Sequence, residues 1–245
     1  MDILGVDIGG TGIKAALVDT QQGELTTERE RILTPQPSTP EAVIAVIQEL
    51  VKHFNYHGPV GVGYPGVILN GATMTAANLD QGWLNFPGAQ AIGEATGCPV
   101  SLINDADAAG LAEMRFGAGR DKMGVVLILT LGTGIGSALF VDGRLVPNTE
   151  LGHLHLPGQK KDAEFRASER ARIEKNLTWP EWAANLDEYL HYVERLFSPS
   201  LFILGGGGAK KAHKFLPLLT VRAPVIPAAL GNEAGIVGAA MAAES

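Results

Sequence analysis

The sequence predicts a protein of the α/β class, in which strands and helices alternate along the chain. Short apolar segments rich in β-branched residues, which are typical of buried strands, alternate with longer segments whose apolar residues recur at helical spacing. A strand, a glycine turn and a second strand near the N-terminus also recur about half a chain length later. The fold is therefore expected to consist of two related α/β halves.

The repeated unit lies at residues 3–18 and again at 125–143. In each copy an apolar strand enters a turn of glycine and threonine, and a second apolar strand leaves it. Aligning Gly9 with Gly132 brings the apolar positions that follow them into register. Glycine adopts positive φ at little cost, and successive backbone N–H groups without Cβ atoms nearby can hold phosphate oxygens. The two turns are therefore either plain tight hairpins or phosphate-binding loops.

The segments between the two copies predict a helix, two strands and the start of a second helix. Residues 40–54 have helical spacing, and residues 59–64 and 99–103 read as strands. Asn104 and Asp105 follow the second of these strands, and both residue types are favoured at helix N-caps. A strand-to-helix junction is expected there.

The later part of the chain is expected to be mostly helical. Helix is predicted from about residue 162 to 197, followed by a strand at 201–204. The four glycines at 205–208 predict a turn, after which a further helix is expected.

Composition excludes several classes of protein. The 245 residues carry 19 Lys and Arg against 26 Asp and Glu, a formal net charge of −7, which argues against a nucleic-acid partner. With 46% hydrophobic residues the chain can bury a sizeable core. Cys98 is the single cysteine, so neither an intrachain disulfide nor a cysteine-rich zinc site can form. No signal peptide or apolar run of membrane-spanning length occurs, so we expect a cytoplasmic protein with no membrane partner.

Two aspartates at predicted strand ends are candidates for chemistry. Asp7 ends the first strand beside the glycine turn, where it would either cap the turn or orient a magnesium-bound water. Asp105 lies at the strand-to-helix junction, where it would act either as an N-cap or as a general base kept ionised by the helix N-terminus. The segment Gly61–Gly66 fits the dinucleotide pattern, but no helix follows its Pro65-Gly66, so a nicotinamide site is disfavoured.

Five motifs, in this order, resemble those of the ROK family of sugar kinases and repressors. They are DIGGTGIK at 7–14, INDA at 103–106, LGTGIG at 131–136, ELGH at 150–153 and LGGG at 204–207. Longer segments, among them NDADAAGLAE and VPNTELGHL, resemble the branch of the family that phosphorylates glucose from polyphosphate. The resemblance implies a duplicated, actin-like (ribonuclease H-like) two-lobed sugar kinase fold with the active site in the interlobe cleft. It further implies a small lobe of residues 1–107, a large lobe of 108–232, and a C-terminal helix, 233–245, that returns to the small lobe.

The resemblance also implies roles for individual residues. Asp105 corresponds to the catalytic base. The sugar-binding set comprises Asn104, Asp105, Glu150, His153, Gly66 and Asn78, with Glu164 expected to supply the last sugar contact. The phosphate-binding set comprises Asp7, Gly9, Gly10, Thr11, Lys14, Gly132, Thr133, Gly134, Gly206, Lys210 and Lys211.

Three lysines are candidates for recruiting a polyanionic donor to an acidic protein. Lys210, Lys211 and Lys214 follow the four glycines, and their spacing on the predicted helix places them on a common face. That face either binds the donor or is simply solvated.

The expected reaction is transfer of a phosphoryl group from inorganic polyphosphate, or ATP, to the 6-hydroxyl of glucose, giving glucose 6-phosphate. The alternatives are an ATP-dependent glucokinase of the same family and, remotely, a sugar-responsive repressor, which is disfavoured because only six residues precede Asp7. Mg²⁺ is expected with the donor, and a homodimer is expected from the resemblance. No structural zinc and no protein metal site are expected, since the family's zinc cysteines are missing and the pair His153 and His155 has no evident third ligand.

Overall fold

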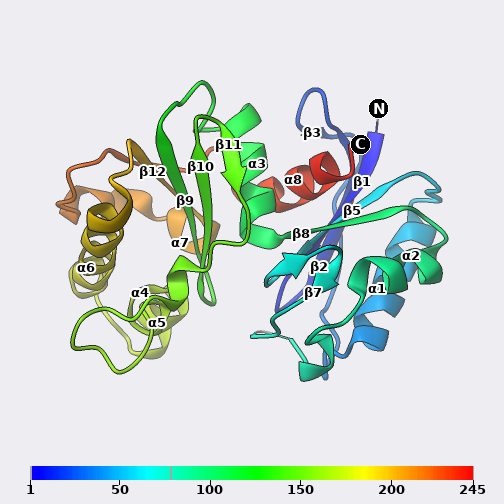
Figure 1. The fold of residues 1–245 in the computed structure, drawn as a ribbon, viewed down its shortest axis with the longest axis horizontal. Coiled ribbons are helices and arrows are strands. Elements are labelled where there is room, and N and C mark those ends of the chain that lie inside the picture. The colour runs from blue at the N-terminus through cyan, green and yellow to red at the C-terminus, as the bar shows by residue number, and fades with distance from the viewer. Residues whose placement is uncertain (1, 78, 245) are drawn as a thin grey trace. The chain divides into compact units, whose positions relative to one another are not determined.

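The computed structural model describes residues 2–77 and 79–244 (Figure 1). The chain divides into two compact units, which we call unit 1 (Met1–Ala112 and Glu233–Ser245) and unit 2 (Glu113–Asn232). Each unit combines its own sheet with helices, which confirms the predicted α/β class. The lobe boundaries expected at 107/108 and 232/233 stay a prediction.

The sheet of unit 1 is built on the first copy of the repeated unit. Its strands are β1 (Asp2–Ile8), β2 (Ile13–Asp19), β3 (Glu24–Leu25), β4 (Glu30–Ile32), β5 (Val60–Tyr64) and β8 (Val100–Asn104). The order is β3-β2-β1-β5-β8, and β4 also pairs with β2. Strands β1 and β2 form an antiparallel hairpin in which Ile8 faces Ile13, whereas β5 and β8 continue the sheet in parallel. The first glycine turn is therefore a hairpin, as predicted. A small separate hairpin joins β6 (Ile68–Leu69) to β7 (Ala72–Thr73).

Helices cover both faces of this sheet (Figure 1). Helices α1 (Pro40–His53) and α2 (Gly88–Thr96) lie on one face, where Val43 and Ile47 of α1 share a core cluster with Leu4 and Val6 of β1. Helix α8 (Ala234–Ala242), drawn in red, covers the other face. A Cβ atom added to Gly5 of β1 would overlap the carbonyl oxygen of Ile236, so glycine is what allows α8 to lie this close.

Helix α8 also lies against α3 (Asp105–Phe116), the helix that follows β8. A Cβ atom added to Gly238 of α8 would overlap the carbonyl oxygen of Ala108 in α3. Backbone thus lies against backbone, with no room for a side chain between them.

The sheet of unit 2 is built on the second copy of the repeat. Its strands are β9 (Val125–Leu131), β10 (Ile135–Val141), β11 (Arg144–Val146), β12 (Leu201–Gly205) and β13 (Val225–Pro227), in the order β11-β10-β9-β12-β13. Leu131 of β9 faces Ile135 of β10 in an antiparallel hairpin, and β12 runs parallel to β9. The second glycine turn is thus also a hairpin, and β10 begins at Ile135, earlier than the sequence predicted.

The segment predicted to be mostly helical, residues 162–197, contains three helices. They are α4 (Glu164–Ala167), α5 (Glu169–Glu174) and α6 (Trp179–Phe197). Ser168 starts α5, since its side chain accepts a hydrogen bond from the N–H of Ala171 at 3.2 Å. Thr178 and Glu181 form a capping box that starts α6. These caps compete with helix continuation, so the segment predicted to be mostly helical is divided into separate helices.

The prediction for residues 205–214 is wrong. Helix α7 (Gly206–Ala209) consists mainly of the glycines expected to form a turn, and it ends at the residue before Lys210. The N–H groups of Lys210 and Lys211 each donate three residues back, to Gly207 and Gly208, and a short 3₁₀ segment, Ala212–Lys214, follows. The three lysines therefore do not share one helical face.

Within the described part of the chain, no helix combines the length and the apolar character needed to cross a membrane.

Candidate active site

The first glycine loop presents backbone groups at the end of the β1–β2 hairpin. The N–H of Gly9 donates to the carbonyl of Gly12 at 3.2 Å, which closes the turn, while Gly10 and Thr11 are exposed. A Cβ atom added to Gly10 would meet nothing within 4 Å. The loop therefore keeps open space beside its exposed N–H groups, as a phosphate-binding concavity needs.

A cation lies against this loop that the sequence did not single out. Arg31 of β4 donates from Nη2 to the carbonyl of Thr11 at 3.2 Å, and its Nε would lie 2.5 Å from a Cβ added to Gly12. Arg31 sits on a three-residue edge strand without any motif, so nothing local indicated its place.

Asp7 and Lys14 face each other across the same hairpin. They are direct partners in the β1–β2 register, and Lys14 Nζ lies 3.0 Å from Asp7 Oδ2. The two side chains are 27% and 17% exposed for Lys14 and Asp7, so each partly buried charge is compensated by the other. The arrangement holds the ammonium group of Lys14 at the base of the loop.

The strand-to-helix junction predicted at residue 104 is present between β8 and α3. The side-chain oxygen of Asn104 accepts from the N–H of Asp107 at 2.9 Å, and its amide nitrogen donates to the carbonyl of Gly66 at 3.1 Å. Asn104 is buried, whereas Asp105 is partly exposed and accepts from the N–H of Ala106 at 2.8 Å. Capping of the helix thus falls to Asn104. The other predicted pocket residue, Asn78, lies outside the described residues.

The second glycine loop is supported by α4 and α5. The N–H of Gly132 donates to the carbonyl of Gly134 at 3.0 Å, and the N–H of Arg170 donates to the carbonyl of Gly132 at 3.0 Å. Glu164 accepts from the N–H of Ile135 at 3.0 Å, and a Cβ atom on Gly134 would overlap its carboxylate. Thr133 is exposed at the tip. Glu164 therefore lies directly on this loop.

The helix of glycines also lies near this loop in unit 2. Gly206 has φ of +79°, and a Cβ atom there would lie 2.6 Å from the carbonyl oxygen of Leu131, the last residue of β9. A Cβ atom on Gly207 would lie 2.5 Å from Oε2 of Glu169 in α5. Glycine is required at Gly206, where φ is positive and backbone lies in the way, whereas at Gly207 the flexible side chain of Glu169 could move aside.

Acidic side chains surround His153 in unit 2. His153 ends the 3₁₀ helix Leu151–His153, with its Nδ1 3.1 Å from Asp162 Oδ2 and its Nε2 3.7 Å from Glu150 Oε2. Burial alone would lower the pKa of His153. The hydrogen bond to Asp162 and the charge of Glu164 outweigh burial, so the pKa of His153 is raised. Burial raises the pKa of Glu150, with His153 opposing and Glu164 adding to the rise.

Three of these groups form a set that could hold a metal ion. Ligand atoms of His153, Asp162 and Glu164 all lie within 4.8 Å of one another. Two candidate ligands thus lie beside His153, whereas His155 is not part of the set, and the expectation of no protein metal site stays a prediction. Asp162 was missed because it lies nine residues from His153 in an irregular segment, where no periodicity relates the two.

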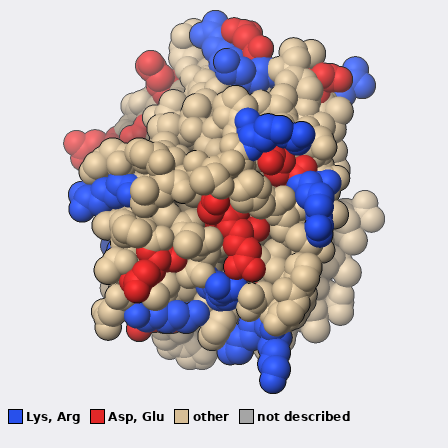
Figure 2. Space-filling model, turned by 90° about the vertical axis from the view of Figure 1, so that its left-hand side faces the viewer, with Lys and Arg blue, Asp and Glu red and all other residues tan. Residues whose placement is uncertain are grey.

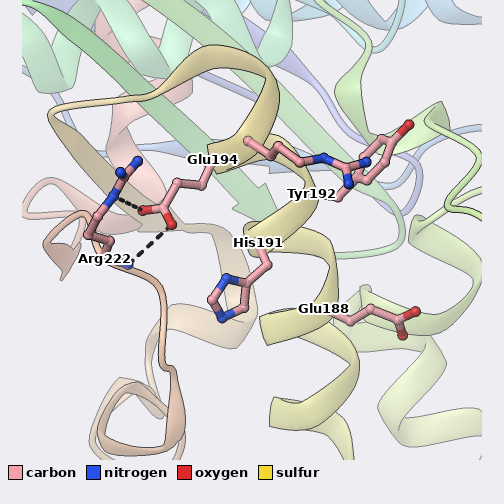
Figure 3. A pocket seen from close by; sticks show the side chains of 6 residues that line it. Glu188, His191, Tyr192, Glu194 and Arg222 are labelled. Atoms are coloured by element: carbon pink, nitrogen blue, oxygen red, sulfur yellow. Dashed lines mark hydrogen bonds and ion pairs between the residues drawn. The ribbon is translucent and has the colours of Figure 1, made fainter.

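A cavity elsewhere in unit 2 contains none of the predicted site residues (Figure 3). It has a volume of about 480 Å³ and is lined by Glu188, His191, Tyr192, Glu194, Arg195 and Arg222. Glu194 accepts from the N–H of Ala223 at 2.6 Å and lies 4.0 Å from Arg222 Nε, whereas Glu188 pairs with Arg166 outside the cavity. The contacts of Glu194 fit a structural link between α6 and the segment before β13.

Two related α/β units, each with a glycine hairpin, define the duplicated, actin-like class of sugar kinase fold. The chain belongs to the ROK family, whose sequence model matches residues 3–165. It is 51% identical to the polyphosphate glucokinase of Mycobacterium tuberculosis (strain ATCC 25618 / H37Rv) over 97% of this chain and 89% of that protein. It is 47% identical to the polyphosphate glucokinase of Mycobacterium leprae (strain TN) over 97% of this chain and 73% of that one.

Solved structures give the same class. The inorganic polyphosphate/ATP-glucomannokinase from Arthrobacter sp. strain KM superposes with a TM-score of 0.94 at 51% identity, covering 98% of this chain and 97% of that one. The ROK family glucokinase from Streptomyces griseus, in complex with glucose and AMPPNP, superposes with a TM-score of 0.86 at 27% identity, covering 100% and 99%. The predicted two-lobed, actin-like fold is thereby confirmed.

Proposed function

We propose that this chain transfers the terminal phosphoryl group of inorganic polyphosphate to the 6-hydroxyl of glucose, giving glucose 6-phosphate. The observation that carries this proposal is 51% identity, over 97% of the chain, to a polyphosphate glucokinase. ATP is proposed as a second donor, because the Arthrobacter relative is described as a polyphosphate/ATP enzyme. The competing candidate, an ATP-dependent glucokinase, rests on weaker similarity, 29% identity to the glucokinase of Streptomyces coelicolor.

Asp105 is the proposed general base. A sugar hydroxyl is not acidic at neutral pH, so its proton needs an acceptor within hydrogen-bond reach. As the hydroxyl oxygen bonds to the terminal phosphorus, the bond from that phosphorus to the rest of the donor breaks and the proton passes to Asp105. Because the transition state is loose, an ordinary carboxylate suffices.

Charge stabilisation accounts for most of the proposed rate enhancement. The backbone N–H groups of the two glycine loops, with Thr11, Thr133 and Lys14, are proposed to bind donor phosphate oxygens. The carboxylate of Asp7 beside the first loop suits Mg²⁺, which prefers oxygen ligands and retains water. Mg²⁺ bound with the donor supplies neutralisation of phosphate charge.

Glu150, His153, Glu164 and Asn104 are proposed to hydrogen-bond the sugar hydroxyls, and Gly66 and Asn78 to line the same pocket. A site built from hydroxyl-binding groups rejects ligands that leave those groups unpaired. In unit 2, Glu164 and His153 both affect the pKa of Glu150, and Glu164 and Glu150 both affect the pKa of His153. We also propose that the protein acts in the cytoplasm as a homodimer.

A coupled assay that measures glucose 6-phosphate tests the donor. With glucose saturating, kcat/KM is expected to be higher for long-chain polyphosphate than for ATP. Turnover with ATP but not with polyphosphate would contradict the proposal and favour the alternative, an ATP-dependent glucokinase.

Changing Asp162 to Asn is expected to lower the pKa of His153 and to raise the KM for glucose several-fold. The carboxylate stabilises the imidazolium form, so its removal shifts the titration of His153 to lower pH. NMR titration of the ring gives the pKa, and initial rates give KM and kcat. Asp187→Asn is the matched control, since Asp187 lies 3.6 Å from Nε2 of His191 in the cavity of Figure 3. If the pKa of His153 were unchanged in the D162N variant, Asp162 would not be the group that raises it.

The protein is expected to need added Mg²⁺ for turnover yet to hold no stoichiometric zinc. The set of His153, Asp162 and Glu164 lacks the thiolates that make structural zinc sites tight. Elemental analysis after dialysis measures the zinc content, and one zinc ion per chain would contradict the prediction. An assay in excess chelator tests the need for magnesium. Full activity under that condition would contradict the prediction.

A further inference from the structure

Two aromatic rings in unit 2 each hold two cations. Nζ of Lys161 and Nζ of Lys175 both lie 3.8 Å from the ring centroid of Phe165. Arg172 Cζ lies 4.2 Å, and Lys214 Nζ 5.6 Å, from the ring centroid of Trp179. One cation on a ring is ordinary, but two like charges on one ring repel each other. We call Lys161, Lys175, Arg172 and Lys214 the paired cations.

No carboxylate forms an ion pair with any of the paired cations among residues 2–77 and 79–244. Neighbouring arginines differ: Arg166, for example, pairs with Glu188 at 2.9 Å. Burial lowers the pKa of Lys175, and the charges of Arg166 and Lys161 lower it further, against a smaller opposing effect of Glu174. Positive charge is thus concentrated here, and Glu174 offsets it only in part.

The ring that carries Arg172 and Lys214 is held firmly in place. Trp179 stacks on Phe215 with 12° between the ring planes and packs edge-on against Trp182. Nε1 of Trp182 donates to the carbonyls of Ala167 and Ser168 at 3.1 and 3.0 Å. Arg172 and Lys214 are therefore presented by packed residues rather than by a mobile loop.

Of the paired cations, Arg172 lies on α5 and Lys175 directly follows it, and α5 also supports the second glycine loop. The N–H of Arg170 in α5 donates to the carbonyl of Gly132 at 3.0 Å. Lys161, Lys175 and Lys214 are exposed and Arg172 is partly exposed, so an anion has access to all four. A chain of phosphates that enters the loop has cations within the same part of unit 2 to meet its other units.

On the face of the molecule drawn in Figure 2, blue and red side chains are interspersed and no broad basic surface appears. Polyphosphate carries roughly one negative charge per unit, so a chain of net charge −7 must attract it through local groups of cations. We propose that the paired cations bind phosphate units of the polyphosphate donor that lie beyond the unit being transferred. This inference rests on the proposed function and extends it to the length of the donor.

Equilibrium binding of sized polyphosphate over a series of NaCl concentrations tests the inference. For the double variant R172A/K214A, the Kd for long chains is expected to rise about tenfold, because two phosphate contacts are lost. The slope of log affinity against log salt is expected to fall by roughly 1.4, given about 0.7 per contact on a single strand. On this proposal tripolyphosphate binds through the glycine loop alone, so it should bind as tightly as before, and the KM for glucose should not change. The second double variant, K161A/K175A, is expected to behave in the same way.

Arg195→Ala is the matched control, because Arg195 is an exposed cation 5.0 Å from the ring centroid of Tyr192 on α6. It should leave both affinity and salt slope unchanged. If the alanine variants fold poorly, R172Q/K214Q removes the charges while keeping the polar stems. An unchanged salt slope, or equal losses for tripolyphosphate and long chains, would overturn the inference. Charge-dependent binding of long chains without any phosphoryl transfer to glucose would instead overturn the proposed function and leave the binding site standing.

Discussion

Replacing Asp105 with Asn should reduce kcat by about 100-fold or more, the usual contribution of a general base. The amide has nearly the same size as the carboxylate but cannot accept the proton of the sugar hydroxyl. Folding should survive, because the side chain of Asn104, not that of Asp105, accepts the N–H of Asp107 at the start of α3. The KM for glucose should change much less than kcat.

The measurement is steady-state turnover with polyphosphate and glucose, together with the Tm of the variant. Asp19→Asn serves as control, since Asp19 also accepts a neighbouring N–H, that of Gln21 at 2.9 Å, in an exposed turn. The control should keep wild-type turnover. A D105N variant that retains more than about a tenth of wild-type kcat would rule out the general-base role.

Replacing Gly238 with Ala should destabilise the protein by about 3 kcal/mol, the upper range for inserting atoms into a packed interior. The new Cβ would overlap the carbonyl oxygen of Ala108, and backbone atoms of two packed helices cannot move aside as a flexible side chain can. Since domains are stable by only about 5–15 kcal/mol, such a loss is large. The midpoint of unfolding in denaturant gives the change.

The same substitution at Gly93 in α2 is the matched control. A Cβ atom there would lie 3.3 Å from the carbonyl of Cys98, so a small adjustment is enough. Alanine also favours helix over glycine, and the two effects should leave stability within about 1 kcal/mol of wild type. Equal midpoints for G238A and wild type would show that α8 and α3 separate easily.

Features that depend on neighbouring residues were predictable from the sequence. The β1–β2 and β9–β10 hairpins follow from apolar strands that flank glycine turns, although their two registers differ by one residue, which the repeat did not indicate. The junction before α3 followed from the N-cap preference of Asn104. In each case the pattern and its physical cause lie within a few residues.

Features that depend on distant contacts or competing caps were not predictable. Ser168 and Thr178 divide a stretch that the sequence predicts only as mostly helical, and the helix boundaries were not predicted. The hydrogen bond between His153 and Asp162 crosses an irregular segment, and the contact of Arg31 with the first loop depends on pairing of an edge strand. Such contacts are set by the tertiary fold, and one sequence carries no local signal of them.

The place of α8 has a consequence for biosynthesis. Unit 1 is made of two separate stretches of chain, and α8 covers one face of a sheet whose strands are all translated before unit 2. Because the chain leaves the ribosome N-terminus first, the face of the sheet that α8 covers stays exposed until the whole of unit 2 has been synthesised. Unit 2, being one continuous stretch, can complete its own core in the meantime. The nascent chain therefore passes through a stage in which Gly5 and Gly61 line a bare apolar surface, the kind of surface that chaperones bind.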